Sequence, residues 1–172
     1  CAVEGEDPPD GAPSGLASGL GRGHTRPPMT SSKSEIDLSY SVSNEFFKLW
    51  LDEGMHYTSA SYVTGNESLE EAQWHKCKIL YDYAEMNADK LVLDIGCGWG
   101  SNLAYHVTRG TKRAHGITLS TAQADWANGK KMSGVNVLLK DFWEYEPAEK
   151  YDALQSIEMV DHVVSPEQAN KG

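Results

Sequence analysis

Residues 91–101 read Leu-Val-Leu-Asp-Ile-Gly-Cys-Gly-Trp-Gly-Ser, and this stretch decides the fold. Its first three residues form an apolar run, as a strand that is buried on both faces requires. Glycines then alternate at positions 96, 98 and 100, and glycine allows a close approach of the backbone because it has no Cβ. Residues 102–108 can be helical. A strand, a glycine turn and a helix predict the start of a βαβ unit, whose turn is a nucleotide site.

Asp94, at the end of this predicted strand, indicates which nucleotide fits. The dinucleotide fingerprint is Gly-x-Gly-x-x-Gly, whereas this chain has Gly-x-Gly-x-Gly two residues after the aspartate. A carboxylate can accept hydrogen bonds from a ligand ammonium group, but it repels a pyrophosphate. The pattern therefore favours S-adenosylmethionine, which is cationic and carries a zwitterionic methionine part, over NAD. The alternative is a glycine turn that binds no ligand.

Length and charge bound the function. A chain of 172 residues suits one domain. Its 15 basic and 25 acidic residues give a net charge of −10 without a basic patch, so we expect no nucleic-acid partner. No apolar run approaches the ~20 residues that span a bilayer. Transient contact with a membrane surface stays open, although the charge opposes anionic headgroups. Three cysteines without ligand spacing predict no metal site and a reducing, cytoplasmic location.

Both ends of the chain differ from its middle. Residues 1–33 hold five of the seven prolines and six of the sixteen glycines, which predicts a disordered Gly/Pro-rich tail. A cleaved targeting peptide, and with it an organelle, is the alternative. Residues 165–168, Ser-Pro-Glu-Gln, are typical of a helix start, but the sequence stops at Gly172. With a first residue that is Cys and not Met, this predicts a fragment whose domain, residues 34–172, is incomplete at its C-terminal end.

Helices and strands are expected to alternate along that domain. An N-terminal cover, residues 34–89, should contain a helix over residues 43–52 and a second helix from a Ser68–Glu71 capping box to about residue 87. After the glycine turn, strands are expected over residues 114–118, 135–139 and 151–157. A capping box of Ser120 and Gln123 should start a helix that ends near residue 131. This order predicts an open parallel α/β sheet, Rossmann-like, with right-handed crossovers.

The candidate site residues converge on one edge of this sheet, because ligands of parallel sheets bind at the carboxyl ends of the strands. An acidic residue that would meet a ribose is expected about 20 residues after the glycines. The chain has Thr118-Leu119-Ser120 there, and Gln123 is the nearest polar substitute. Asp161 and His162 follow the fourth predicted strand. They are candidate acid–base groups, and the alternative is a helix cap and a packed ring. Glu158 is left undecided.

Six segments, in their order along the chain, resemble the cyclopropane-fatty-acid synthase family of S-adenosylmethionine-dependent methyltransferases. This family includes the mycolic acid cyclopropane synthases. The segments are residues 40–47, 55–60, 68–73, 92–100, 116–120 with Gln123, and 156–162. The glycine motif alone indicates only a methyltransferase. The aromatic N-terminal segment and Gly-Ile-Thr-Leu-Ser-x-x-Gln make the resemblance specific. It implies a class I methyltransferase fold.

The resemblance implies ten cofactor-binding residues. From the methionine end to the adenine end they are Asp94, Gly96, Gly98, Tyr57, Thr58, Thr118, Leu119, Gln123, Asp141 and Phe142. The first three are implied to hold the methionine part, and the next two to close over it. The following three would face the ribose. The last two would bind adenine, through a carboxylate and a ring.

The implied reaction is methyl transfer to the double bond of an unsaturated acyl chain in lipid biosynthesis, with bound bicarbonate as the base. The chain departs from the family pattern because Ser59 replaces a cysteine, Ser39 a histidine, and Asp161 the glutamate before His162. Ser59 would still donate a hydrogen bond to bicarbonate, and Asp161 with His162 would form an acid–base pair. Two alternatives stay open: a small-molecule N- or C-methyltransferase, and a truncated, non-catalytic copy that binds the cofactor or a partner.

Overall fold

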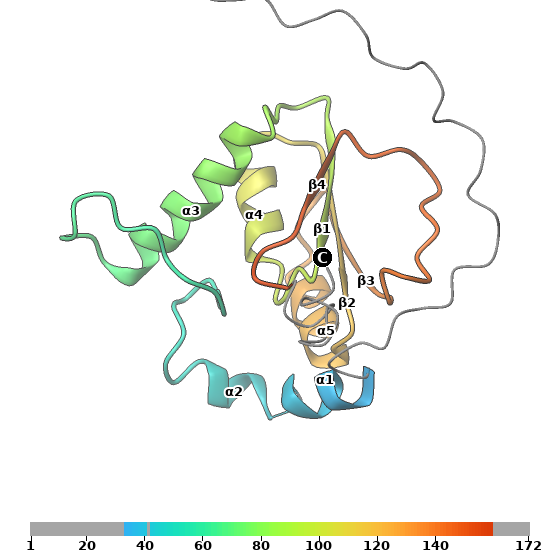
Figure 1. Cartoon of the computed structure of the whole chain (residues 1–172), viewed down its shortest axis with the longest axis horizontal. Helices are drawn as coiled ribbons and strands as arrows, with labels where there is room; N and C mark the ends of the chain where they lie inside the picture. Colours follow the sequence, from blue (N-terminus) through green and yellow to red (C-terminus); the bar gives the residue numbers. More distant parts are fainter. Residues whose placement is uncertain (1–32, 41, 160–172) are drawn as a thin grey trace, which may run out of the picture.

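The computed structural model describes residues 33–40 and 42–159, and every structural statement below concerns these residues (Figure 1). The predicted helix start at Ser165 and the candidate residues Asp161 and His162 therefore lie outside the described residues. So does the predicted tail, apart from Lys33, which begins the first helix.

Four parallel strands form the sheet, in the order β3-β2-β1-β4. They are β1 (Leu91–Ile95), β2 (Arg113–Thr118), β3 (Val135–Leu139) and β4 (Ala153–Gln155). The register places Asp94 opposite Gly116 on β2 and Gln155 on β4. The predicted open parallel α/β sheet is thereby confirmed. The register also brings the carboxyl ends of these strands to one edge.

Three helices complete the α/β unit: α3 (Leu69–Tyr83), α4 (Ser101–Thr108) and α5 (Thr121–Gly129). In Figure 1, α3 and α4 lie next to each other on one side of the sheet. Leu103 of α4 and Ala124 and Ala127 of α5 share one buried cluster with Val92 and Val137 of the sheet. Burial of this apolar face is the main stabilising contribution of such a layer.

The part of the chain before α3, which we call the cover from here on, contains α1 (Lys33–Tyr40) and α2 (Asn44–Phe47). No helix was predicted at α1. The helix predicted over residues 43–52 is present but shorter, because α2 ends at Phe47. After Phe47 the backbone continues in turns, with Leu49 N–H bonded to Phe46 C=O at 3.1 Å. The apolar residues here surround the helix axis, so a longer helix would bury only part of them. Leu49 is accordingly 81% exposed and Phe47 is buried.

Two further boundaries differ from the prediction for local reasons. Helix α3 ends at Tyr83 because Glu85 takes a left-handed φ of 48° and Met86 N–H bonds to Tyr81 C=O at 3.1 Å. This is a Schellman end without the usual glycine. Strand β4 begins only at Ala153, since the Asp152 carboxylate accepts the Leu91 N–H at 2.7 Å. Across the described part of the chain, no helix is both long and apolar enough to cross a membrane.

Candidate functional site

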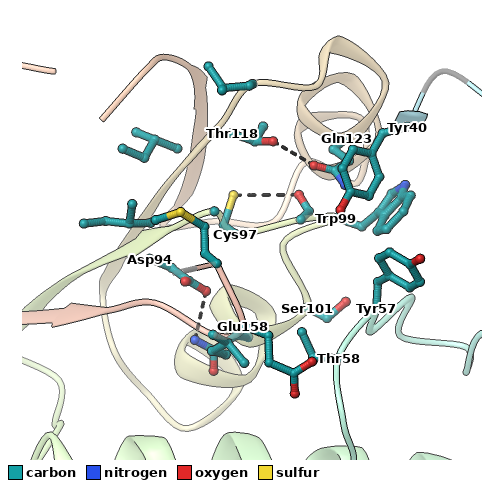
Figure 2. A pocket seen from close by; sticks show the side chains of 18 of the residues that line it. Tyr40, Tyr57, Thr58, Asp94, Cys97, Trp99, Ser101, Thr118, Gln123 and Glu158 are labelled. Atoms are coloured by element: carbon teal, nitrogen blue, oxygen red, sulfur yellow. Dashed lines mark hydrogen bonds between the residues drawn. The ribbon is translucent and has the colours of Figure 1, made fainter. Parts of the chain in front are cut away.

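A cavity of about 150 Å³ opens where β1 and β2 end (Figure 2). Nine of the ten predicted cofactor-binding residues line it: Tyr57, Thr58, Asp94, Gly96, Gly98, Thr118, Leu119, Gln123 and Phe142. Asp141 is not among the lining residues. Its carboxylate accepts the N–H of Trp143 at 3.1 Å. The cavity therefore lies at the edge of the sheet where the sequence predicted the site. The individual roles of these residues stay predictions.

The glycine turn forms one wall of this cavity. The N–H groups of Gly96 and Cys97 both bond to Ile117 C=O, at 2.9 and 3.1 Å, which ties the turn to β2. Gly96 and Gly98 have φ values of 75° and 55°, in the left-handed region that side chains disfavour. A Cβ on Gly96 would also lie 2.7 Å from Met159 Cγ. Both conformations therefore favour glycine, and at Gly96 a side chain would in addition displace Met159.

Asp94 is the buried charge of the site, with 1% of its surface exposed. Its Oδ2 accepts a hydrogen bond from Asn102 Nδ2 at 3.0 Å. Its Oδ1 is buried and has no hydrogen-bond partner among the described residues. Burial raises the pKa of Asp94 to about 7, against the opposing effects of the Asn102 hydrogen bond and the Lys76 charge. An unpaired buried carboxylate oxygen beside a cavity is suited to a cationic donor.

At the end of β2, Thr118 and Gln123 are joined by a hydrogen bond. Ser120 starts α5 as predicted, and its hydroxyl oxygen accepts the Gln123 N–H at 3.3 Å. The reciprocal half of the predicted capping box is wrong, because Gln123 Oε1 accepts from the Thr118 hydroxyl at 2.7 Å. Gln123 is consequently held at the cavity wall, and not folded back on the helix end.

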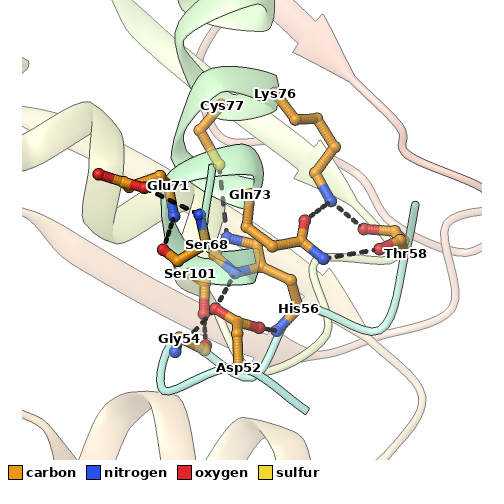
Figure 3. A network of polar contacts seen from close by, with 10 residues as sticks. All are labelled: Asp52, Gly54, His56, Thr58, Ser68, Glu71, Gln73, Lys76, Cys77 and Ser101. Atoms are coloured by element: carbon orange, nitrogen blue, oxygen red, sulfur yellow. Dashed lines mark hydrogen bonds and ion pairs between the residues drawn. The ribbon is translucent and has the colours of Figure 1, made fainter. Parts of the chain in front are cut away.

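The cover reaches the cavity through residues 52–58, which Asp52 organises (Figure 3). The Asp52 carboxylate accepts hydrogen bonds from Gly54 N at 2.9 Å, His56 N at 2.7 Å and His56 Nδ1 at 2.8 Å. Burial would raise the pKa of Asp52, but these hydrogen bonds outweigh it and lower the pKa. On the other side of the ring, His56 Nε2 lies 3.4 Å from Cys77 Sγ on α3. His56 is thus fixed at both nitrogens.

Helix α3 also holds Thr58 (Figure 3). Gln73 Nε2 donates to Thr58 C=O at 2.8 Å, and Lys76 Nζ donates to the Thr58 hydroxyl and to Gln73 Oε1. Burial lowers the pKa of Lys76, partly offset by the charges around it, Glu158 and Asp94 among them. The two polar residues of α3 therefore fix the loop at the cavity mouth.

Among the predicted catalytic residues, only Ser59 is described. It is exposed and does not line the cavity, but its N–H donates to Glu158 Oε1 at 2.8 Å. Glu158 itself lines the cavity and has a left-handed φ of 49°, which is uncommon for a side-chain residue. The sequence left Glu158 undecided. The feature of the sequence that pointed to Glu158 is its position three residues after the end of β4.

A second cavity, of about 980 Å³, adjoins the first beneath the cover. Tyr40, His56, Tyr57, Thr58 and Glu158 are among the residues that line both. Four aromatic rings gather there, from Tyr40, Phe47, Trp50 and Tyr57, with centroids 5.3 to 6.1 Å apart in the contacting pairs. The sequence did not predict this cavity, because its rings come from α1, α2 and the loop before α3.

Known proteins match this chain in sequence and in structure. Residues 28–170 match the family model described as mycolic acid cyclopropane synthetase. Cyclopropane mycolic acid synthase 2 of Mycobacterium bovis is 40% identical over 107 residues, which are 62% of this chain and 33% of the relative. (S)-coclaurine N-methyltransferase of Papaver somniferum is 28% identical over 141 residues, 78% of this chain and 40% of the relative.

Among solved structures, mycolic acid cyclopropane synthase CmaA1, complexed with SAH and CTAB, superimposes with a TM-score of 0.71 at 26% identity. The match covers 77% of this chain and 47% of that one. The chain thus spans about a third of the length of the first curated relatives it matches.

Proposed function

Because the chain belongs to the mycolic acid cyclopropane synthetase family, we propose that it binds S-adenosylmethionine in the first cavity and transfers the methyl group to the double bond of an unsaturated acyl chain in lipid biosynthesis. The observation that carries the proposal is the unpaired Asp94 Oδ1 beside the glycine turn. It fits the cationic part of this cofactor and opposes a pyrophosphate. The related structure of CmaA1 with SAH supports the same choice.

The methyl acceptor belongs in the second cavity. When bound, S-adenosylmethionine supplies a methyl group that its sulfonium activates for attack by a weak nucleophile such as a π bond. Tyr57 and Thr58 lie between the two cavities and would orient the two reactants toward each other. The aromatic rings around them would exclude water from an apolar chain. Their π faces would also stabilise the positive charge that develops on the acceptor.

Bicarbonate stays a prediction from the family resemblance, because Asp161 and His162 lie outside the described residues. Ser59, at the position that implied a bicarbonate ligand, directs its N–H to the Glu158 carboxylate. A second anion there would meet the charge of Glu158 and lose that donor. We assign no step to bicarbonate. Glu158, which lines both cavities, would itself accept the proton that the acceptor releases.

A small-molecule amine is the second candidate acceptor. The second cavity combines the carboxylates of Glu35 and Glu158 with aromatic rings, and carboxylates with aromatic faces are the groups that recognise ammonium ions. The similarity to (S)-coclaurine N-methyltransferase agrees with this candidate. In that reaction Glu158 would take the amine proton.

Incubation of the chain with methyl-labelled S-adenosylmethionine, with total lipid in one arm and an amine panel in the other, tests the proposal. Label in the lipid fraction is the expected result, and Glu158→Gln should reduce it. Label in the amine panel alone would overturn the acyl acceptor in favour of the second candidate. Calorimetric binding of the cofactor without transfer in either arm would indicate a cofactor-binding protein without turnover.

A further inference from the structure

We propose that Asn102 is a further cofactor-binding residue: its side-chain oxygen Oδ1 and Asp94 Oδ1 together accept the hydrogen bonds of the cofactor's α-ammonium group, and Gln155 is the positioning residue that turns Asn102 into this orientation. The inference rests on the proposed cofactor and adds an assignment for the methionine end of the cavity. Sequence reasoning gave neither Asn102 nor Gln155 a role.

Asn102 and Asp94 line one cavity, and each has one acceptor oxygen without a hydrogen-bond partner among the described residues. Only 4% and 1% of their surfaces are exposed. Asn102 Nδ2 donates to Asp94 Oδ2 at 3.0 Å and to Gln155 Oε1 at 2.7 Å, which uses both amide protons. Asn102 Oδ1 and Asp94 Oδ1 are each buried without a hydrogen-bond partner among the described residues. A donor with several protons would satisfy two such acceptors.

The orientation of Asn102 follows from a backbone carbonyl on α3. Leu80 C=O accepts from Gln155 Nε2 at 3.1 Å, and because a carbonyl can only accept, Gln155 must turn its Oε1 toward α4. That oxygen accepts from Asn102 Nδ2 and from His106 Nε2, the latter at 3.0 Å. Burial lowers the pKa of His106, so a neutral ring with its proton on Nε2 satisfies the contact. A flipped Asn102 amide would place its oxygen against those of Gln155 and Asp94.

The chemistry of these acceptors matches an ammonium group. A carboxylate oxygen provides charge, and an amide oxygen provides a second, neutral acceptor, so a cation with three N–H donors satisfies both. A carboxyl or phosphate group of a ligand would be repelled by the same atoms. Asp94 of β1 and Asn102 of α4 flank the glycine turn, whereas the predicted ribose-facing residues Thr118 and Gln123 belong to β2 and α5.

Isothermal calorimetry with two probes tests the inference. S-adenosylhomocysteine carries the ammonium group, whereas 5′-methylthioadenosine has the same nucleoside without the amino-acid part. We expect Asn102→Leu to weaken S-adenosylhomocysteine binding by about tenfold, as for a lost hydrogen bond to a charged group. Gln155→Met should weaken it by roughly threefold to tenfold, since the amide is then free to flip. Binding of 5′-methylthioadenosine should change less than about twofold in both variants, and Asn136→Leu, at an exposed position of β3, is the matched control.

The outcomes separate the inference from the proposed function. Equal losses for both probes would assign Asn102 and Gln155 a structural role and overturn the inference. Unchanged S-adenosylhomocysteine binding would overturn it as well. If neither probe binds the unaltered chain, the proposed cofactor itself is wrong. Should Asn102→Leu fail to fold, Gln155→Met, which leaves Asn102 in place, decides between these outcomes.

Discussion

Two buried carboxylates, Asp94 and Asp52, are similar in burial and opposite in chemistry. Asp94 belongs to the floor of the first cavity, by which we mean Asp94 and the glycine turn of residues 96–100, and Asp52 belongs to the cover. The floor aspartate accepts one hydrogen bond, keeps Oδ1 unpaired, and has a raised pKa. The cover aspartate accepts three hydrogen bonds and has a lowered pKa. Burial alone therefore does not mark a binding residue. A second criterion is needed as well: a buried atom without a hydrogen-bond partner, in a residue that lines a cavity, indicates a candidate binding residue.

The largest effect should come from Asp52→Ala, which breaks the structural half of this comparison. Three donors, one of them the His56 ring, would lose their acceptor inside the cover. We expect a loss of about 2–4 kcal/mol in the free energy of unfolding, measured by urea denaturation, from several lost hydrogen bonds. Asp89→Ala, which removes an exposed partner of Lys112, is the control. Equal stability of the two variants would contradict the structural role of Asp52.

Asp94→Asn should show the reverse of Asp52→Ala, with its larger effect on ligand affinity and not on the free energy of unfolding. The variant keeps the shape of the floor but removes the charge that faces the ligand. Cofactor affinity should fall by about 1.5–3 kcal/mol, the range for a hydrogen bond to a charged group, as measured by calorimetry with S-adenosylmethionine. Unchanged affinity would argue against the place we assign to the cofactor.

The pH dependence of the ligand-free protein should distinguish the two carboxylates in one experiment. The pKa of Asp94 is about 7 in the folded chain against 3.8 ordinarily, so the folded state binds the extra proton between these values. Asp94 therefore lowers stability as pH rises from about 4 toward 7, and this decline should vanish in Asp94→Asn. Asp52, with a lowered pKa, contributes stability that is lost only as pH falls below its ordinary 3.8. Urea unfolding between about pH 2 and pH 8 measures both, with the Asp94 effect between pH 4 and 7 and the Asp52 effect below pH 4.

The ionisation of Asp94 should affect ligand affinity in the opposite direction to stability. In the proposed site the cofactor binds to the ionised Asp94 carboxylate, so affinity should rise as pH increases through about 7. Lys76 and Cys77 on α3 and Cys97 in the turn are other titratable groups that interact with this carboxylate. An affinity that stays constant from pH 6 to pH 8 would show that Asp94 does not change protonation on binding.

The floor was predictable from the sequence because it is local. Asp94 and the glycines lie within seven residues, and one strand and one turn place them. The cover was not predictable in the same way, since His56 meets Cys77 and Ser59 meets Glu158 only in the folded chain. Asn102 escaped notice for a related reason. A polar residue early in a helix is usually exposed, and the folded structure shows that this one is buried between Asp94 and Gln155.

The smallest predicted effect concerns the link between the two regions. Lys48, at the end of α2, places Nζ 4.6 Å from the ring centroid of Trp126 on α5. A double-mutant cycle of Lys48→Met and Trp126→Leu should give a coupling of about 0.5–1 kcal/mol in unfolding free energy. Lys130→Met is the matched control, because its Nζ lies 5.6 Å from the same ring but belongs to the end of α5 itself.

A coupling at Lys48 that exceeds the one at Lys130 would show that this contact fastens the cover to the α/β unit. If the Lys48 cycle gave no coupling, the cover would be held by its other contacts, among them Trp99, whose Nε1 donates to Asn44 Oδ1 at 2.8 Å and whose ring lies 4.8 Å from Phe47. Through Trp99 the cover contacts the glycine turn beside the first cavity. A ligand that orders this turn would then also stabilise the second cavity. Cofactor binding would strengthen acceptor binding, and acceptor binding would strengthen cofactor binding by the same factor.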